Sequence, residues 1–326
     1  MIKYTNIELN NSRCNFDCSM CTVNRSKSFY LSLDIKKNYL LELKESGAAL
    51  PDAVVCFLKG EPLMNIDELC ELVTFCNQIG YKSILVTNGS LLSLENVQRL
   101  ISCGLKNVRI SLDSHMEEIY VQYRNKSLYS QKVNNIKSFA NYKNQLSYSI
   151  SLGAHIVVTS LNISHLKEYL AFCEDELGVD LVNILFLDRM IVGDPKENFY
   201  KKHFIKDIDL LEKVLNQCKE SPLVNLSESD IGYILEYHRR INLGLRDSSY
   251  ECRLCEFNSV FDTESNFQHC YLFGAGRLRY NKEGDFRKFI MPRLDHNRNL
   301  IKRSKCNDYC FIIGYNSIKV FENGVI

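Results

Sequence analysis

The sequence lacks a long apolar run, and no segment approaches the ~20 residues of a membrane-spanning helix. It also lacks a charge imbalance, because 40 Lys and Arg against 39 Asp and Glu leave a formal net charge of +1. That balance predicts binding to neither nucleic acids nor membranes. Residues 1–6 carry no signal-peptide pattern, and we find no internal repeat. With 45% hydrophobic and 24% charged residues in 326, we expect a globular cytoplasmic protein.

Cysteine is the residue present in excess, with 14 in the chain. Disulfides are not expected in the cytoplasm, where clustered cysteines are metal ligands or catalysts. The clustered cysteines are Cys14, Cys18 and Cys21 near the start, and Cys252, Cys255, Cys270, Cys306 and Cys310 near the end. The others stand alone among apolar neighbours, where core packing is the expected role: Cys56, Cys70, Cys76, Cys103, Cys173 and Cys218.

Strand and helix patterns alternate about six times up to residue 190. The predicted strands are 3–9, 53–58, 83–87, 108–112, one within 147–158, and 181–186. The predicted helices are 33–46, 65–79, 93–103, 116–123, 130–144 and 163–177. This alternation predicts parallel βαβ units and an α/β fold, a partial (β/α)6 barrel over residues 1–220. A helix at 207–218 is expected to close the barrel, another is expected at 229–242, and residues 221–326 are expected to form a small cysteine-rich α+β domain.

The first cysteine cluster has the spacing Cys14-x3-Cys18-x2-Cys21 and directly follows the first predicted strand. Three thiolates at this spacing can hold three irons of a [4Fe–4S] cluster, whereas four protein ligands would close it. The remaining iron leaves an open position, as a reactive metal site requires. The alternatives are chance spacing or a zinc site, although zinc prefers four ligands and Cys-x2-Cys pairs.

This motif resembles the cysteine motif of the radical S-adenosylmethionine (SAM) superfamily. The resemblance implies that the amino and carboxylate groups of SAM chelate the open iron. It further implies that an electron from the cluster breaks a carbon–sulfur bond, and that a 5′-deoxyadenosyl radical then abstracts a hydrogen atom from the substrate. The resemblance covers roughly residues 3–190, and its other motifs follow successive strands, where such barrels carry their chemistry.

Four later segments carry the same resemblance. Residues 59–62 (Lys-Gly-Glu-Pro) resemble the family's Gly-Gly-Glu-Pro, whose acid and backbone receive the SAM amino group, with lysine replacing the first glycine. Residues 87–89 (Thr-Asn-Gly) stand where relatives often hold the ribose. Residues 111–113 match the family's Ser-Leu-Asp, and Arg124 stands where relatives place an arginine for the SAM carboxylate. The implied SAM-binding residues are Met20, Gly60, Glu61, Pro62, Asn88, Ser111, Asp113 and Arg124; Met20 takes the place of an aromatic residue near the adenine. An ordinary turn or surface charge is the alternative for any single one.

The second cysteine cluster reads Cys252-x2-Cys255-x14-Cys270, followed by Cys306-x3-Cys310. Residues 260–267, between Cys255 and Cys270, are typical of a hairpin with a polar turn. The arrangement resembles the SPASM or twitch extension, which implies one auxiliary [4Fe–4S] cluster. Five cysteines complete one such cluster with one to spare. The expected ligands are Cys255, Cys270, Cys306 and Cys310, although Cys252 can replace any of them; a structural zinc site is the alternative.

The surplus thiol, for which Cys252 is the candidate, can donate a hydrogen atom to a substrate radical, as peptide epimerases of the superfamily do; a passive thiol is the alternative. The same cysteines also resemble those of GTP 3′,8-cyclase, but no arginine follows Cys255 here. A stretch rich in Lys and Arg between Cys270 and Cys306 can attract an anionic substrate or can be a solvated face.

The motifs therefore predict a radical SAM enzyme that most resembles peptide-modifying relatives, which epimerise, cross-link or oxidise residues. A sugar or nucleotide-like metabolite is the alternative substrate. A non-catalytic iron–sulfur protein is the alternative of another class. The expected partners are the substrate and a reductant such as flavodoxin or ferredoxin.

Overall fold

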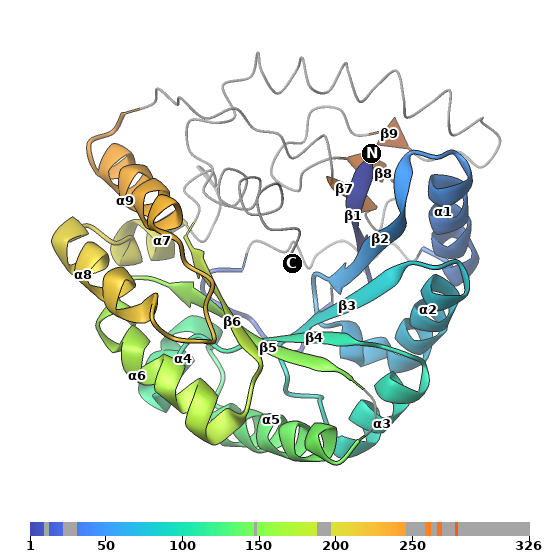
Figure 1. The fold of residues 1–326 in the computed structure, drawn as a ribbon, viewed down its shortest axis with the longest axis horizontal. Coiled ribbons are helices and arrows are strands. Elements are labelled where there is room, and N and C mark those ends of the chain that lie inside the picture. Colours follow the sequence, from blue (N-terminus) through green and yellow to red (C-terminus); the bar gives the residue numbers. More distant parts are fainter. Residues whose placement is uncertain are drawn as a thin grey trace.

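The computed structural model describes residues 1–9, 13–21, 31–146, 149–187, 197–245, 258–261, 266–268 and 278–279. Six parallel strands follow one another in chain order across a curved sheet (Figure 1). They are β1 (Ile2–Glu8), β2 (Ala49–Leu58), β3 (Lys82–Thr87), β4 (Asn107–Ser111), β5 (Ser151–Val158) and β6 (Leu181–Phe186). Parallel neighbours in chain order require a crossover after each strand, and the helices supply it. The predicted α/β partial barrel is confirmed.

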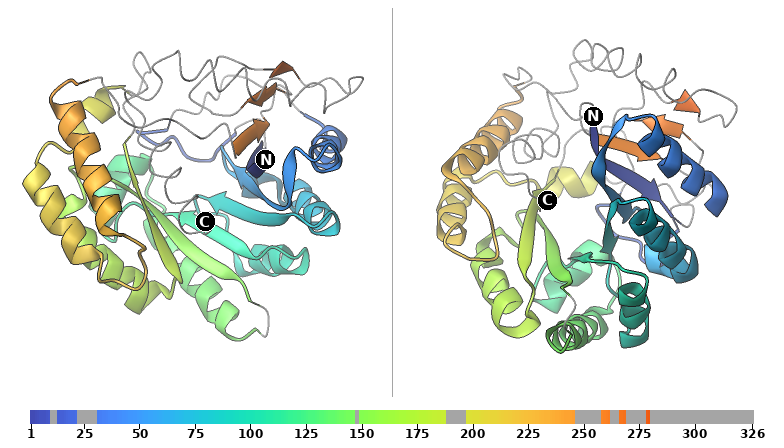
Figure 2. Two further views of the ribbon diagram at one scale, coloured as in Figure 1. Left: turned by 45° about the horizontal axis from the view of Figure 1, so that its top comes forward. Right: turned by 45° about the vertical axis from the view of Figure 1, so that its right-hand side comes forward.

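The helices lie on the convex side of this sheet, except α7 (Glu197–His203), which lies at the strand ends beside the cysteine loop (Figures 1 and 2). They are α1 (Leu33–Glu45), α2 (Ile66–Gln78), α3 (Leu94–Ser102), α4 (Glu117–Arg124), α5 (Tyr129–Asn144), α6 (Leu166–Ala171), α7 (Glu197–His203), α8 (Ile208–Cys218) and α9 (Glu228–Asn242). The helix predicted at 163–177 is three segments: a 3-10 turn (Ile163–His165), α6, and a π-helical turn (Phe172–Leu177). Helix α7 was not predicted.

Local signals set most helix starts. Ser32, Ser93 and Ser227 cap α1, α3 and α9, and each side chain accepts a hydrogen bond from a first-turn N–H group. At α9 the cap is reciprocal, because Asp230 also accepts from the backbone of Ser227.

The two faces of the sheet differ in chemistry. The side chains that pack under the helices are apolar and fully buried, as with Val55, Phe57 and Leu152. Alternate residues point to the concave face, where β4, β5 and β6 place Ser111, His155, Asn183 and other polar, partly buried groups. Hydrophobic burial therefore fixes the outer layer and leaves the concave face for chemistry.

The sheet is open, with β6 at one edge. At the other end, β7 (Asn258–Phe261) pairs with β1 in parallel, and β8 (Asn266–Gln268) and β9 (Leu278–Arg279) follow antiparallel. The predicted hairpin at 260–267 is thus present and extends the barrel sheet. Helix α8 does not close the barrel: it packs against α6 and α9 in the helix layer. The domain boundary at residue 220 stays a prediction, although buried α9 residues such as Ile234 join the barrel core.

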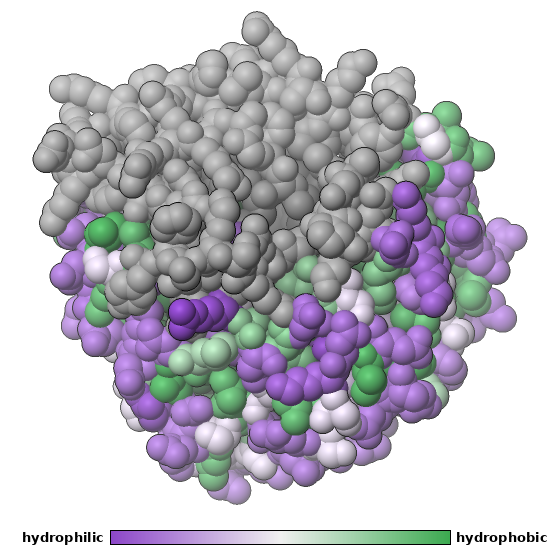
Figure 3. Space-filling model, turned by 180° about the vertical axis from the view of Figure 1, so that it is seen from behind, coloured by the Kyte–Doolittle hydropathy of each residue, from purple (hydrophilic) through white to green (hydrophobic). Residues whose placement is uncertain are grey.

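The described surface is mixed rather than apolar. Figure 3 shows polar side chains separating small apolar groups on one face. Within the residues that the structure covers, no helix combines the length and apolarity needed to span a bilayer.

Candidate active site at the strand ends

The cysteine loop after β1 is held by two other elements of the barrel. Ser19 donates its N–H to the carbonyl of Tyr123 (2.7 Å) and its hydroxyl to Asn125 Oδ1 (2.9 Å), both at the end of α4. The Tyr200 hydroxyl of α7 donates to the carbonyl of Met20 (2.9 Å). The loop between Cys18 and Cys21 is therefore anchored to α4 and α7.

The start of the same loop is tied to the ends of β2 and β3. The N–H of Glu61 donates to the carbonyl of Arg13 (2.7 Å). Asn88 Nδ2 donates to Asn15 Oδ1 (2.8 Å), and Asn15 Nδ2 donates to the Ser90 hydroxyl (2.8 Å). The cysteine motif and the motifs after β2 and β3 therefore meet at the carboxyl ends of the strands.

The cysteine sulfur atoms have donors around them. Cys14 Sγ accepts from the Phe16 N–H (3.4 Å) and from Asn88 Nδ2 (3.8 Å). Cys18, which is buried, accepts from an Arg124 guanidinium nitrogen (3.5 Å). Cys14 and Cys21 are partly exposed. N–H donors stabilise sulfur that carries negative charge, so this environment fits cluster-bound thiolates.

Among the described residues, no three Cys, His, Asp or Glu side chains gather as ligands of a single metal ion. In a [4Fe–4S] cluster each cysteine binds a different iron, so a cluster needs a wider arrangement than one ion does. The second cysteine cluster cannot be placed, since Cys252, Cys255, Cys270, Cys306 and Cys310 lie outside the described residues.

The turn after β2 brings Glu61 into the interior. Its Oε1 accepts from the Thr87 hydroxyl (2.6 Å) and from the Leu63 N–H (3.1 Å), and its Oε2 accepts from the Asn88 N–H (2.7 Å). Burial raises the pKa of Glu61, and these hydrogen bonds oppose the rise. The carboxylate thus joins the β2 and β3 turns, while Pro62 opens the 3-10 turn (Pro62–Asn65) that leads into α2.

Two consecutive residues in this turn have left-handed backbone, Lys59 (φ +73°) and Gly60 (φ +69°). That conformation is strained for lysine and free for glycine. Lys59 forms an ion pair with the buried Glu8 at the end of β1. The lysine that replaces the family's first glycine therefore has a partner that accounts for its position.

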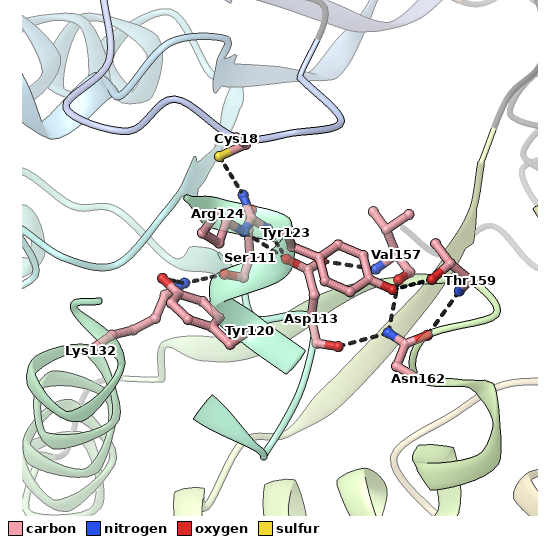
Figure 4. Close-up of polar contacts among 10 residues, drawn as sticks. All are labelled: Cys18, Ser111, Asp113, Tyr120, Tyr123, Arg124, Lys132, Val157, Thr159 and Asn162. Atoms are coloured by element: carbon pink, nitrogen blue, oxygen red, sulfur yellow. Dashed lines mark hydrogen bonds and ion pairs between the residues drawn. The ribbon is translucent and has the colours of Figure 1, made fainter. Parts of the chain in front are cut away.

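Ser111 is the last residue of β4 and Asp113 lies just after it, and Figure 4 shows their network. Asp113 is fully buried; its Oδ1 accepts from the Val157 N–H (3.1 Å) and its Oδ2 from Arg124 Nε (2.6 Å). The backbone carbonyl of Asp113 accepts from Asn162 Nδ2 (2.7 Å). The structure thus brings Asp113 and Arg124 together with Cys18, as the motif order predicted for one site.

Sequence reasoning missed Lys132 of α5, which is fully buried. Its Nζ donates to the Ser111 carbonyl and to the Tyr120 hydroxyl (3.2 Å), and it lies over the Tyr120 ring. Burial, reinforced by Arg124, lowers the pKa of Lys132 to about 7. A signal was available, because Lys132 shares its helix face with the apolar Ile136 and Phe139.

Asn15, Thr159 and Asn162 were also missed. Thr159 and Asn162 follow β5, so the strand-end rule that selected the other motifs would have found them. Asn162 Oδ1 accepts from the Thr159 N–H (2.8 Å), and Tyr123 is hydrogen-bonded to the Thr159 hydroxyl. Asn15 had no signal beyond its place between the cysteines.

The concave face below these turns carries a neutral histidine. His155 Nε2 lies 2.8 Å from Asn183 Nδ2, so the two side chains are hydrogen-bonded. Burial, with the nearby Arg109, lowers the pKa of His155 to about 3. Arg109 itself is buried, and its Nε has no hydrogen-bond partner in the part of the chain that the structure describes.

Comparisons with known proteins found similar sequences and similar folds. Sequence similarity extends to GTP 3′,8-cyclase of Staphylococcus aureus, 25% identical over 248 residues, which are 72% of this chain and 67% of the cyclase. The fold is similar to Streptococcus suis SuiB bound to the precursor peptide SuiA (TM-score 0.68, 16% identity, 91% of this chain and 67% of SuiB). It is also similar to native anSMEcpe with bound SAM and the Kp18Cys peptide (TM-score 0.66, 16% identity, 91% and 83%).

A family model settles the identity. The Radical SAM superfamily model matches residues 11–173, half of the chain, and these residues include the cysteine loop and the turns after β2, β3 and β4. Members of this family are enzymes that use a [4Fe–4S] cluster and SAM. The chain therefore belongs to the radical SAM superfamily.

Proposed function

We propose that this enzyme activates a C–H bond of a peptide substrate and so epimerises, cross-links or oxidises a residue. The observation that carries the proposal is the likeness to SuiB and anSMEcpe, whose structures were solved with peptides. That likeness spans 91% of this chain and reaches beyond the segment that the family model matches.

In this proposal Cys14, Cys18 and Cys21 hold the catalytic cluster, which supplies the electron that cleaves SAM. The SAM site in this proposal is formed by residues of the cysteine loop, of the turns after β2, β3 and β4, and of the end of α4: Met20, Gly60, Glu61, Pro62, Asn88, Ser111, Asp113 and Arg124. Their contacts support it, because Asn88 and Arg124 each donate to a cysteine sulfur. The left-handed Gly60 lets a ligand approach the backbone closely.

The proposal also includes one auxiliary cluster on the second cysteine group, with Cys252 as the candidate hydrogen donor. The β7–β8 hairpin between Cys255 and Cys270 supports this part, because β7 pairs with β1, the strand that leads into the first cysteine loop. The auxiliary cysteines would then be tied to the sheet that carries the catalytic ones.

A nucleotide substrate is the second candidate, favoured by the sequence similarity to GTP 3′,8-cyclase. Both candidates need a site on the concave face, where His155 and Asn183 offer hydrogen bonds. The lowered pKa of His155 keeps its ring neutral above acidic pH.

The test offers both substrates to the reconstituted enzyme with SAM and a strong reductant. The probes are synthetic peptides encoded by short reading frames beside the gene, and GTP. Mass spectrometry should show a peptide that loses two hydrogens or, for epimerisation, exchanges one hydrogen for deuterium in D2O. The Cys14, Cys18 and Cys21 triple alanine variant is the control and should leave every peptide unchanged. Conversion of GTP with all peptides unchanged would replace the proposal with the nucleotide candidate.

A further inference from the structure

Arg124 connects a buried carboxylate to a cysteine sulfur. Its Nε and one terminal nitrogen bind Asp113 Oδ2, and its other terminal nitrogen donates to Cys18 Sγ (3.5 Å). All three residues are at least nine-tenths buried. Figure 4 shows the guanidinium between the Asp113 carboxylate and the cysteine loop.

The surroundings hold this guanidinium in place from both sides. On one side, Asp113 is fixed by the Val157 N–H and by Asn162 Nδ2. On the other, the end of α4 is joined to the cysteine loop, because Ser19 donates to the Tyr123 carbonyl and to the left-handed Asn125. A planar fork bound along one edge by a carboxylate has its remaining nitrogen aimed in a fixed direction. Here that direction is the Cys18 sulfur.

Hydrogen bonds to cluster sulfur atoms are among the factors that set the reduction potential of an iron–sulfur cluster. A reduced cluster carries one more negative charge than an oxidised one. A cationic donor at a ligand sulfur therefore stabilises the reduced form more, and burial strengthens the effect.

We infer that Arg124 is a positioning residue that raises the reduction potential of the catalytic cluster through its hydrogen bond to Cys18, with Asp113 aiming the guanidinium. The inference rests on the proposed function, in which Cys18 is a cluster ligand. It differs from the role that the family resemblance implies for Arg124, contact with the SAM carboxylate, because it acts without SAM.

The experiment measures the midpoint potential of the catalytic cluster without SAM, in wild-type protein and in Arg124→Gln. The catalytic cluster is identified as the paramagnetic signal that the triple cysteine variant lacks. We expect Arg124→Gln to shift the reduced-to-oxidised ratio at a fixed potential about tenfold toward the oxidised form, which is 59 mV for one electron. Arg99→Gln is the matched control, because Arg99 pairs with Asp67 on the surface and should leave the potential unchanged.

The inference is wrong if Arg124→Gln carries the catalytic cluster and the midpoint potential of that cluster equals the wild-type value, even if the affinity of the variant for SAM falls. That outcome would leave contact with the SAM carboxylate as the role of Arg124. If Arg124→Gln retains no cluster, wild-type protein labelled with 15N in the arginine guanidinium groups provides the second measurement. Pulsed electron paramagnetic resonance must then show a 15N coupling to the reduced catalytic cluster, and absence of the coupling overturns the inference. A wild-type protein that never cleaves SAM contradicts the proposed function instead.

Discussion

Asn88 shows how much one side chain does at this site. Its backbone N–H binds Glu61, its Nδ2 reaches Asn15 and the Cys14 sulfur, and its Oδ1 accepts from the Ser90 N–H (2.9 Å). The sequence marked Asn88 as functional because it follows a strand, but the ribose contact implied by resemblance stays a prediction. Apart from the local Ser90, its partners could not be predicted, since Glu61, Asn15 and Cys14 belong to turns tens of residues away.

One buried histidine gives a prediction about how the stability of the protein depends on pH. His238 of α9 is buried among aromatic rings, and this burial lowers its pKa to about 4, against the hydrogen bond to the Ile234 carbonyl. Between pH 6.5 and 4 the unfolded chain binds a proton that the folded protein does not, so stability falls as pH falls. At pH 5 this one group should cost roughly 2 kcal/mol relative to pH 7.

The measurement is urea unfolding of wild type and His238→Phe at both pH values. Phenylalanine keeps the aromatic packing and removes the titration. We expect the variant to lose about 2 kcal/mol less than wild type between pH 7 and pH 5. Equal losses in the two proteins would show that His238 titrates normally in the folded state.

At the scale of elements, sequence patterns predicted the strands and most helices to within a few residues. The predicted strand 53–58 is shorter than β2, which begins at Ala49, because Pro51 and Asp52 interrupt its apolar run. Helix α7 was missed, since it has only seven residues and most of them are polar. Yet α7 anchors the cysteine loop through Tyr200, a tertiary contact that no local pattern contains.

The turn after β3 gives an element-scale prediction. Gly89 has left-handed backbone (φ +79°), and a Cβ there would lie 2.7 Å from Ile110 Cγ2. Gly89→Ala should therefore reduce the free energy of unfolding by about 1–3 kcal/mol and loosen the Asn88 contact with Cys14. Denaturant titration and iron content after reconstitution provide the two measurements.

Gly232 in α9 is the matched control. Nothing lies within 4 Å of a Cβ at that position, and the residue is exposed on a helix. Gly232→Ala should raise the free energy of unfolding by up to about 1 kcal/mol and leave the iron content unchanged. If Gly89→Ala were as stable and as iron-rich as Gly232→Ala, the turn after β3 would not constrain the site.

At the scale of the whole molecule, the alternation of strands and helices sufficed for the barrel, because each βαβ unit buries its own apolar face. The opening of the sheet was harder to predict. Helix α8 has the amphipathic pattern of a helix that closes a barrel, yet it packs against α6 and α9 instead. The β7–β1 pairing joins residues about 250 positions apart, and nothing local specifies such a pairing.

The candidate site shows the same difference between features that local patterns predict and contacts that depend on tertiary packing. Three cysteines, the three motifs after β2, β3 and β4, and Arg124 were visible because their types and order are unusual together. The Arg124–Asp113 pair was visible only as two separate motif residues, and its contact with Cys18 depends on how α4 meets the cysteine loop. The sequence therefore predicts which residues carry the chemistry, whereas the contacts between those residues depend on tertiary packing.

The most direct test of the account is 5′-deoxyadenosine release by the anaerobically reconstituted protein with SAM and dithionite, measured by chromatography. Wild type should release it, and so should Cys218→Ala, which alters a buried core cysteine in α8. The Cys14, Cys18 and Cys21 triple alanine variant should release none while keeping about half of the iron, since the proposed auxiliary cluster would remain. Release by the triple variant at the wild-type level would contradict the account.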